Sequence, residues 1–185
     1  TVSTVLVAPA VALGAGSDNG PDANDGITGI TAPQLVGTAE ADALITLRDG
    51  AVLLGTTYAD GAGAWSFTTP ALGGGAHALH VAQTSGGITS PAATLNITID
   101  LRLMTGTAGR DVFTFTQEAD FTDPGRWIDG LGDVDNLALN FAVNLGDAAF
   151  ADLHQLEKIT LGAAGAQSLV LVAQAALAFG ARLEV

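Results

Sequence analysis

The chain has 185 residues, 19 of them Asp or Glu and 6 Lys or Arg, which gives a formal net charge of −13 at pH 7. This charge argues against binding to nucleic acids and to anionic membranes, because their phosphates would be repelled. No cysteine is present, so disulfides, thiolate metal sites and cysteine nucleophiles are excluded, and we expect neither a transmembrane helix nor a signal peptide from the apolar pattern.

Two short strands and a long irregular segment are expected at the start of the chain. Residues 1–7 alternate well enough to form a leading strand, and residues 11–13 form a second one. Residues 14–32 carry few apolar side chains, and 19 irregular residues are unusual inside a compact domain. Something other than a core of its own must organise this segment. Its potential oxygen ligands for an ion are Asp18, Asp22, Asn24 and Asp25.

Regularly spaced strands follow as far as residue 100. We expect them at residues 33–38, 43–48, 51–58, 64–68, 77–83 and 93–99, with turns at Asp49-Gly50 and at residues 60–63. An Asp-Gly pair accepts the positive φ of a two-residue hairpin turn. Short strands at a spacing of 8–12 residues predict an antiparallel β-sandwich over residues 8–100.

The pattern changes at residue 101, where we place the start of a second β-rich domain, 101–185. Strands are expected at residues 112–116, 137–141, 158–161 and 168–172, and one or two helical turns at 148–156. The first three strands are about twenty residues apart, too far for simple hairpins. Their spacing fits a parallel coil of strands, such as a β-roll or solenoid, at least as well as a sandwich.

Acidic side chains gather at the ends of these strands rather than on helical faces. Carboxylates placed together repel one another unless a hard cation lies between them, and Ca²⁺ binds six to eight oxygen atoms. The sequence therefore predicts calcium in the loops and at the joint between the domains. Besides the four residues in segment 14–32, the candidate ligands are Glu40, Asp42, Asp49, Asp60, Asp100, Asp111, Asp133 and Asp135, and Asp129 lies among the last of them.

The strand order sorts the candidates of the first domain between its two ends. Glu40, Asp42 and Asp60 are expected at one end, and Asp49, Asp100 and the loop from Asp18 to Asp25 at the other. Asp100 is then next to the second domain, and an ion there could bridge the two.

Residues 8–100 resemble the bacterial Ig-like repeats of giant adhesins exported by type I secretion, the Bap-like biofilm proteins. The resemblance implies a stalk module in which calcium orders the loops and joints. The segments that carry it are Ser17–Gly20, Asp25–Thr28, Pro33–Glu40, Arg48–Gly50, Leu54–Thr56, Ala59–Gly61, Trp65–Phe67 and Thr98–Asp100.

The second part resembles the region near the C-terminus of the same adhesins, where degenerate RTX nonapeptides (Gly-Gly-x-Gly-x-Asp-x-apolar-x) occur among strands. Gly106–Thr114 matches except at Thr107, and Gly130–Ala138 matches at Gly130, Asp135 and Leu137 but departs at Leu131 and Asp133. Leu156–Leu161 is similar to the segment between such turns. RTX calcium sites use stacked tandem turns, so the resemblance implies ligands at Asp111 and Asp135 within a truncated RTX-like domain.

Other conspicuous side chains favour structural roles. His77 and His80 lie three residues apart on one expected strand and so face opposite sides, which prevents a compact metal pair. Trp65 and Phe67 face the same side and are expected in the core. The chain contains no Gly-x-Ser-x-Gly elbow, no His-Glu-x-x-His and no phosphate-binding loop, so we do not expect an enzyme.

Three functions remain open. The first is a calcium-stiffened stalk segment of a large secreted adhesin or biofilm-matrix protein on the bacterial surface, with neighbouring repeats of the same protein as partners. The second is a subunit of an extracellular fibre or surface layer, assembled by donating residues 1–7 to a neighbour's sheet edge. Residues 1–7 would otherwise be the last strand of a preceding repeat. The third is a carbohydrate-binding module for host or surface glycans.

Overall fold

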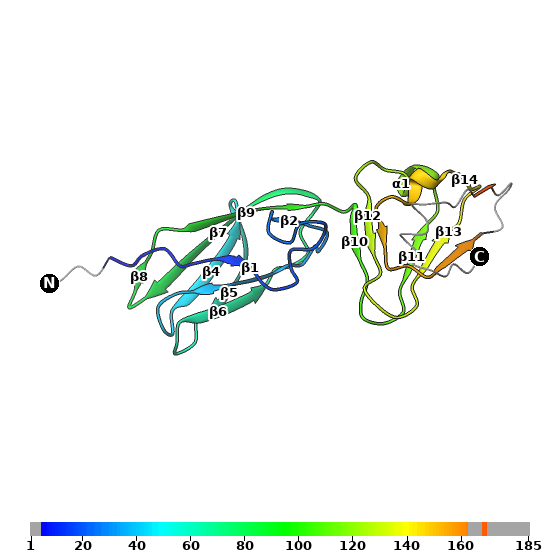
Figure 1. Cartoon of the computed structure of the whole chain (residues 1–185). Helices are drawn as coiled ribbons and strands as arrows, with labels where there is room; N and C mark the ends of the chain where they lie inside the picture. Colours follow the sequence, from blue (N-terminus) through cyan, green and yellow to red (C-terminus); the bar gives the residue numbers. More distant parts are fainter. Residues whose placement is uncertain (1–4, 163–167, 170–185) are drawn as a thin grey trace. The chain divides into compact units, whose positions relative to one another are not determined.

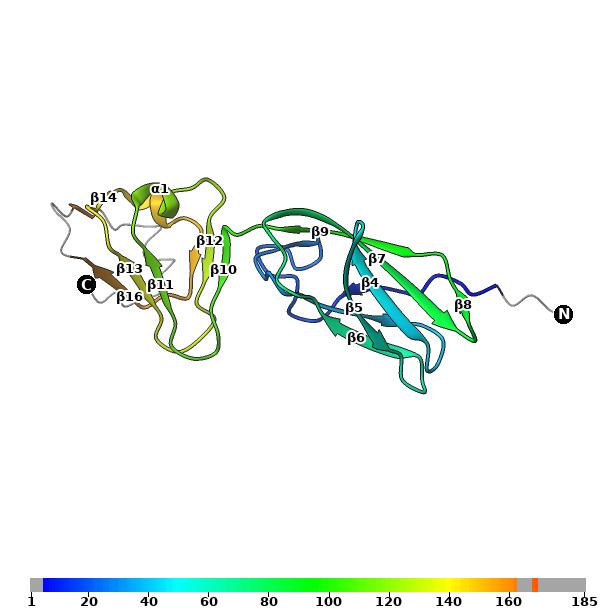
Figure 2. The same cartoon turned by 180° about the vertical axis from the view of Figure 1, so that it is seen from behind.

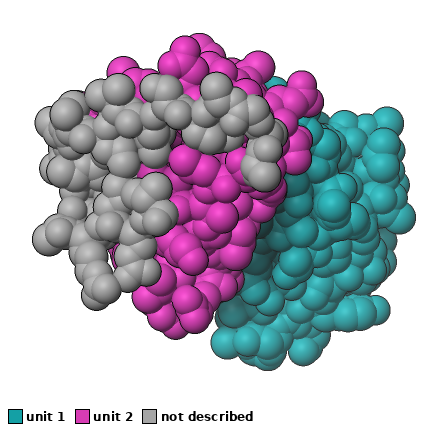
Figure 3. Space-filling model, turned by 90° about the vertical axis from the view of Figure 1, so that its right-hand side faces the viewer, with its two compact units in different colours: residues 1–101 teal, residues 102–185 magenta. Residues whose placement is uncertain are grey.

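The computed structural model describes residues 5–162 and 168–169. Almost all its regular structure is β-strand, and the chain divides into two compact units, residues 1–101 and 102–185 (Figures 1 and 3). The predicted all-β fold is confirmed.

Among its described residues, the first unit contains nine strands in two layers, and every pairing except that of β2 with β9 is antiparallel. One sheet has the order β1-β3-β6, and the other has the order β2-β9-β7-β4-β5, with β8 beside β7. Figure 2 labels β4, β5, β7, β8 and β9 of the larger sheet and β6 of the smaller one. The strands are β1 (Ala12–Leu13), β2 (Ile27–Thr28), β3 (Gln34–Thr38), β4 (Leu44–Asp49), β5 (Val52–Tyr58), β6 (Ala64–Thr68), β7 (Gly75–Ser85), β8 (Ile88–Thr89) and β9 (Ala93–Ile99).

Alternation along the strands fills the space between the two sheets. Ile45 and Leu47 of β4 face inward with Leu79 and Val81 of β7, and all four are almost fully buried. Trp65 lies in the same core at 4% exposure, as its alternation in β6 predicts. The core is therefore mainly aliphatic, with one large aromatic anchor.

The irregular segment 14–32 connects the two sheets of the sandwich. It leaves β1, which pairs with β3, and contains a strand that the sequence did not predict, β2, which pairs in parallel with β9 on the other sheet. Thr28 of β2 is fully buried. The segment is thus fixed at both ends by backbone pairing, and Gly, Asp and Asn residues form the turns between.

Several strand boundaries differ from prediction by a residue or two. The first hairpin turn is Gly50-Ala51, between the paired residues Asp49 and Val52, and Gly50 has a φ of 53°. The expected leading strand is wrong for residues 5–7, which lie outside every sheet, and residues 1–4 are outside the described residues.

The second unit is a parallel coil. The strand orders are β10-β12-β15, β11-β13-β16 and β14-β17, and every pairing is parallel. The elements are β10 (Leu103–Thr105), β11 (Val112–Phe115), α1 (Glu118–Phe121), β12 (Trp127–Asp129), β13 (Asn136–Leu139), β14 (Asn144–Leu145), the 3₁₀ helix η1 (Asp147–Phe150), β15 (Leu153–His154), β16 (Lys158–Leu161) and β17 (Ser168–Leu169).

In successive coils, apolar side chains at equivalent positions stack on one another. Phe113 lies beside Leu137, which lies beside Ile159, and all three point into the core of the coil. Phe121 and Phe150 close the same core, with ring centroids 5.9 Å apart. This is the parallel alternative that the wide strand spacing predicted.

The region predicted to form one or two helical turns does so only in part. Residues 147–150 form one 3₁₀ turn, but Leu153 and His154 form a strand of the parallel sheet. The strand predicted at 168–172 is seen as β17, and residues 170–172 lie outside the described residues.

Candidate functional site

The loop from Asp18 to Asp25 lies in the connection between β1 and β2, and we call it the crossover loop. The amide of Gly26 donates to Asp18 Oδ2 (3.1 Å). Asn19 Oδ1 accepts from Thr28 Oγ1 (2.6 Å) and from the amide of Gly29 (2.7 Å). Side chains at the start of the loop thus bind the backbone at its end.

Three more predicted ligands lie at the exposed tip of this loop. Asp22 Oδ1 accepts from the amide of Asn24 (3.0 Å), and Asp25 Oδ1 accepts from the amide of Ile27 (2.8 Å). Both are Asx turns, in which a carboxylate binds the backbone two residues on. The tip is therefore shaped by its own carboxylates, each through one oxygen.

Asp18 has the most unusual environment in the crossover loop. Its Oδ1 atom is buried and has no hydrogen-bond partner. Asp18 and Asn24 both line a surface cavity of about 390 Å³ between β1 and the loop tip. A buried carboxylate oxygen without a donor is costly unless a cation or a solvent molecule satisfies it.

Glu40, Asp42 and Asp60 lie at the opposite end of the sandwich. The amide of Asp42 donates to the carbonyl of Asp60 (3.3 Å), and Asp60 Oδ1 accepts from the amides of Ala62 and Ala64. Asp42 has a φ of 59°, in the left-handed region. All three side chains are exposed, and the contacts given for Asp60 are those of a turn.

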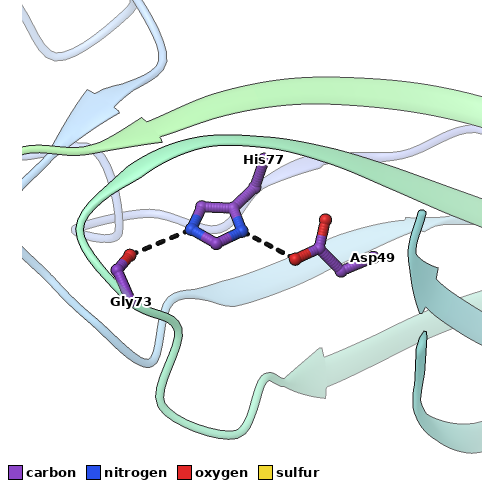
Figure 4. A network of polar contacts seen from close by, with 3 residues as sticks. All are labelled: Asp49, Gly73 and His77. Carbon is purple, nitrogen blue, oxygen red and sulfur yellow. Dashed lines mark hydrogen bonds and ion pairs between the residues drawn. The ribbon is translucent and has the colours of Figure 1, made fainter. Parts of the chain in front are cut away.

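Asp49 pairs with a histidine rather than with another carboxylate. Asp49 Oδ2 lies 2.7 Å from His77 Nδ1, and His77 Nε2 lies 2.9 Å from the carbonyl oxygen of Gly73 (Figure 4). Both partners can only accept when Asp49 is ionised, and a protonated imidazole can donate to both of them at once. The hydrogen bond to Asp49, followed by that to Gly73, raises the pKa of His77 above its usual value of 6.5.

Asp100 follows β9 at the same end of the first unit as the crossover loop. Its amide donates to the carbonyl of Thr28 (2.8 Å), and the amide of Thr98 donates to the carbonyl of Gly26. Asp49, Asp100 and the crossover loop therefore share one end of the sandwich, as the strand order predicts.

Three acidic residues of the second unit lie one above another, each immediately before a strand of the same sheet. Asp111 precedes β11, Asp135 precedes β13 and Glu157 precedes β16, and these strands pair in register. The amide of Asp111 donates to Asp135 Oδ1 (2.7 Å), and the amide of Asp135 donates to Glu157 Oε2 (2.8 Å). We call these three residues the turn carboxylates.

Asp135 is fully buried, and its Oδ2 has no hydrogen-bond partner. Burial raises the pKa of this carboxyl, and the charges of Glu157, Asp111 and Asp133 add to the effect, whereas the amide of Asp111 lowers it. Asp133 and Asp129 are not part of the stack. Asp133 Oδ1 binds the amide of Val134, and Asp129 Oδ1 binds that of Leu131.

Strand order in the first unit separates β1-β3-β6 from β9-β7-β4-β5, the division found in immunoglobulin sandwiches. A family model described as a bacterial Ig-like domain matches residues 4–101. The chain belongs to the bacterial Ig-like domain family. No curated protein matches it.

Bacterial Ig-like domains are typically structural, and they are often found on surface proteins. Within residues 5–162 and 168–169, no helix is long and apolar enough to cross a membrane. The match covers the first unit and ends where the parallel coil begins.

Calcium fits the candidate residues unequally. Among the described residues, no group of three or more His, Asp or Glu side chains is arranged to hold a metal ion. In the Ig-like domain, the crossover loop combines the buried, unpartnered Asp18 Oδ1 with a cavity and with carboxylates that use only one oxygen each. Asp49 is engaged by His77, and Asp60 by its own turn.

The sequence reasoning did not identify two residues of these sites. Asn19 holds the crossover loop to Thr28. The only sequence signal for this contact is an Asn nine residues before a Thr, a spacing that belongs to no recognised motif. Glu157 completes the turn carboxylates. It lies 22 residues after Asp135, which itself lies 24 residues after Asp111, and this near-repeat is the signal that could have found it.

Proposed function

We propose that the chain is a structural segment of a large secreted bacterial surface protein, in which it spaces or projects an adhesive or matrix-forming part. Membership of the bacterial Ig-like family supports this role. The two-layer core and the short parallel coils support it as well. Both bury aliphatic and phenyl side chains, as a structural scaffold does.

We further propose that calcium stiffens the Ig-like domain at the crossover loop. The observation that carries this proposal is Asp18 Oδ1, which is buried without a partner beside a cavity that Asn24 also lines. Asp22 and Asp25, whose second oxygens accept no hydrogen bond from the described residues, would complete the oxygen set as the tip closes on the ion. Binding would remove freedom from the one long connection of the domain.

Thermal unfolding of the whole chain in calcium and in EGTA tests the proposal. At about ten to a hundred times the dissociation constant, calcium should stabilise the domain by about 1.4–2.7 kcal/mol per site. Magnesium should act poorly, because it requires a tighter octahedral shell and keeps its waters.

A pair of variants locates the effect. Asp25→Ala should reduce the calcium-dependent shift in melting temperature, whereas Asp60→Ala, at the other end of the sandwich, should leave it unchanged. Identical melting curves in calcium and EGTA for the unmodified chain would overturn calcium stiffening.

No specific observation favours either alternative function, the strand-donating fibre subunit or the carbohydrate-binding module. In the leading segment, Leu6 is buried and the carbonyl of Val7 accepts from Gln83 Nε2 (2.8 Å), so this segment is bound to its own domain. Trp65, which would have to be exposed to stack on a sugar, lies in the core.

A further inference from the structure

The turn carboxylates occupy equivalent places in three successive coils. Val112, Asn136 and Lys158 are register partners across the parallel sheet, and each directly follows one of these acidic residues. The stack therefore repeats once per coil, and two of its three members, Asp111 and Asp135, are residues where the resemblance to RTX turns implies calcium ligands.

One oxygen of each carboxylate in this stack already has a donor. Glu157 Oε2 accepts from the amide of Asp135, and Asp135 Oδ1 accepts from the amide of Asp111 (2.8 and 2.7 Å). Asp111 Oδ2 accepts from the amide and the hydroxyl of Thr107 in its own turn (2.6 and 3.0 Å). Glu157 and Asp135 thus each hold the backbone of the preceding coil, and Asp111 holds that of its own turn.

Main-chain hydrogen bonds connect the same successive coils. The amide of Asn136 donates to the carbonyl of Asp111 (2.9 Å), and the amides of Glu157 and Lys158 donate to the carbonyl of Asp135 (3.2 and 3.1 Å). These carbonyl oxygens are the other group that a calcium ion between turns would need, and they too are engaged.

Glycine backbone approaches two of the turn carboxylates closely. A Cβ on Gly106 would come within 2.8 Å of Asp111 Oδ2, and one on Gly130 would overlap both Asp135 Oδ2 and the carbonyl oxygen of Gln155. The unpartnered Asp135 Oδ2 is sealed from solvent at this place. One buried oxygen is far short of the six to eight that calcium takes.

We infer that the turn carboxylates form a metal-independent hydrogen-bond ladder that keeps the parallel coils in register, so that the second unit holds its structure without calcium. This inference refines the proposed function, because it confines calcium stiffening to the Ig-like domain. The acidic residues resemble RTX positions in sequence, but here amide groups take the place of the ion.

Amide hydrogen exchange of the whole chain, measured residue by residue in calcium and in EGTA, tests the inference. The reporters are the amides of Thr107, Asp111 and Asp135, which donate to the ladder. Their exchange rates should agree in the two conditions to within about threefold. A larger acceleration in EGTA at these three amides would overturn the inference.

Paired substitutions separate a hydrogen-bond acceptor from a metal ligand. Asp111→Asn keeps an acceptor oxygen for Thr107 but removes the negative charge, so exchange at Thr107 should stay close to the unmodified rate. Asp111→Leu removes the acceptor and should accelerate it by about tenfold or more. Asp120→Asn and Asp120→Leu, at an exposed position of α1, are the controls.

Equal acceleration by Asn and Leu at residue 111 would contradict the ladder, because only the charge would then matter. If Asp111→Leu does not fold, the comparison of Asp111→Asn with the unmodified chain, and the EGTA comparison, still decide. The amides of Gly26 and Gly29, which bind the crossover loop, report separately on the proposed function. Their insensitivity to calcium would count against calcium stiffening and leave the ladder intact.

Discussion

His77 and Asp49 form an ion pair at the end of the Ig-like core, with 2.7 Å between Nδ1 and Oδ2 (Figure 4). Asp49 ends β4 and His77 lies near the start of β7, two neighbouring strands of the larger sheet. The second ring nitrogen binds the carbonyl of Gly73, so the pair also fixes the loop that leads from β6 into β7.

The stability of the first unit should depend on the protonation of His77. Because the folded pKa is raised above 6.5, the protonated ring stabilises the fold, fully at pH below 6.5, and this contribution is lost as the pH rises through the folded pKa. Asp25, which lines the same open pocket as His77, adds a second carboxylate on that side.

The free energy of unfolding, measured by chemical denaturation at pH about 5.5 and about 8.5, should fall with pH more in the unmodified chain than in His77→Gln. His80→Gln, whose histidine pairs with Thr94 on the other face, is the control, and equal pH dependence in all three proteins would refute the prediction.

Asp135→Asn should stabilise the second unit at neutral pH. The folded pKa of Asp135 is raised, so ionisation of this buried carboxyl lowers the free energy of unfolding as the pH rises through the folded pKa. Asparagine keeps an acceptor for the amide of Asp111 and carries no charge. Denaturation of the second unit at pH about 4 and about 7 should show that the variant gains relative to the unmodified chain only at the higher pH. A variant less stable at pH 7 would mean that the carboxylate charge is compensated.

Gly130→Ala should destabilise the second unit by about 1–3 kcal/mol or more, because the added Cβ overlaps the backbone of Gln155 and the buried Asp135. Gly132→Ala is a matched control two residues away in the same turn. A Cβ there meets nothing within 4 Å, and the expected change is within about 1 kcal/mol. Urea unfolding monitored at the second unit gives both values, and equal effects would show that the close contact at Gly130 is not limiting.

Gln83→Met should destabilise the Ig-like domain by about 1–3 kcal/mol despite the similar size of the two side chains. Gln83 is 1% exposed, and its amide joins two distant segments: Oε1 accepts from the amide of Glu40 (2.7 Å), and Nε2 donates to the carbonyl of Val7 (2.8 Å). Methionine can make neither bond. Ser66→Ala, at an exposed position of β6, should change the free energy of unfolding little, and a Gln83→Met variant as stable as this control would contradict the prediction.

Sequence patterns predicted those strands whose signals lie in a short stretch of the chain. Alternation and turn residues located β3 to β7 and β9 to within about two residues, because both signals lie within or next to the strand itself. β2 was missed because it is two residues long and its partner, β9, lies some seventy residues further on. The spacing of β11, β13 and β16 predicted parallel pairing, but β10, β12 and β15 are two or three residues long and show no alternation.

The position of a carboxylate in the sequence does not decide whether it binds an ion or a backbone amide. Carboxylates were correctly located at the ends of strands, since polar turn residues are readable from composition. Whether Asp111 or Asp25 offers its oxygens to an ion depends on which amides point at them, and that depends on backbone conformation. The partner of Asp49 could not be read from the sequence either, because the half-buried His77 lies 28 residues away.

The parallel pairing of β2 with β9 determines how these two strands would separate under mechanical load. Tension on the chain would pull β2 from its N-terminal end and β9 from its C-terminal end, in opposite directions along strands that run the same way. The bonds from Thr98 to Gly26 and from Asp100 to Thr28 would then be sheared together rather than opened one at a time. A pull of this kind would have to break both bonds at once before β2 and β9 could slide past one another.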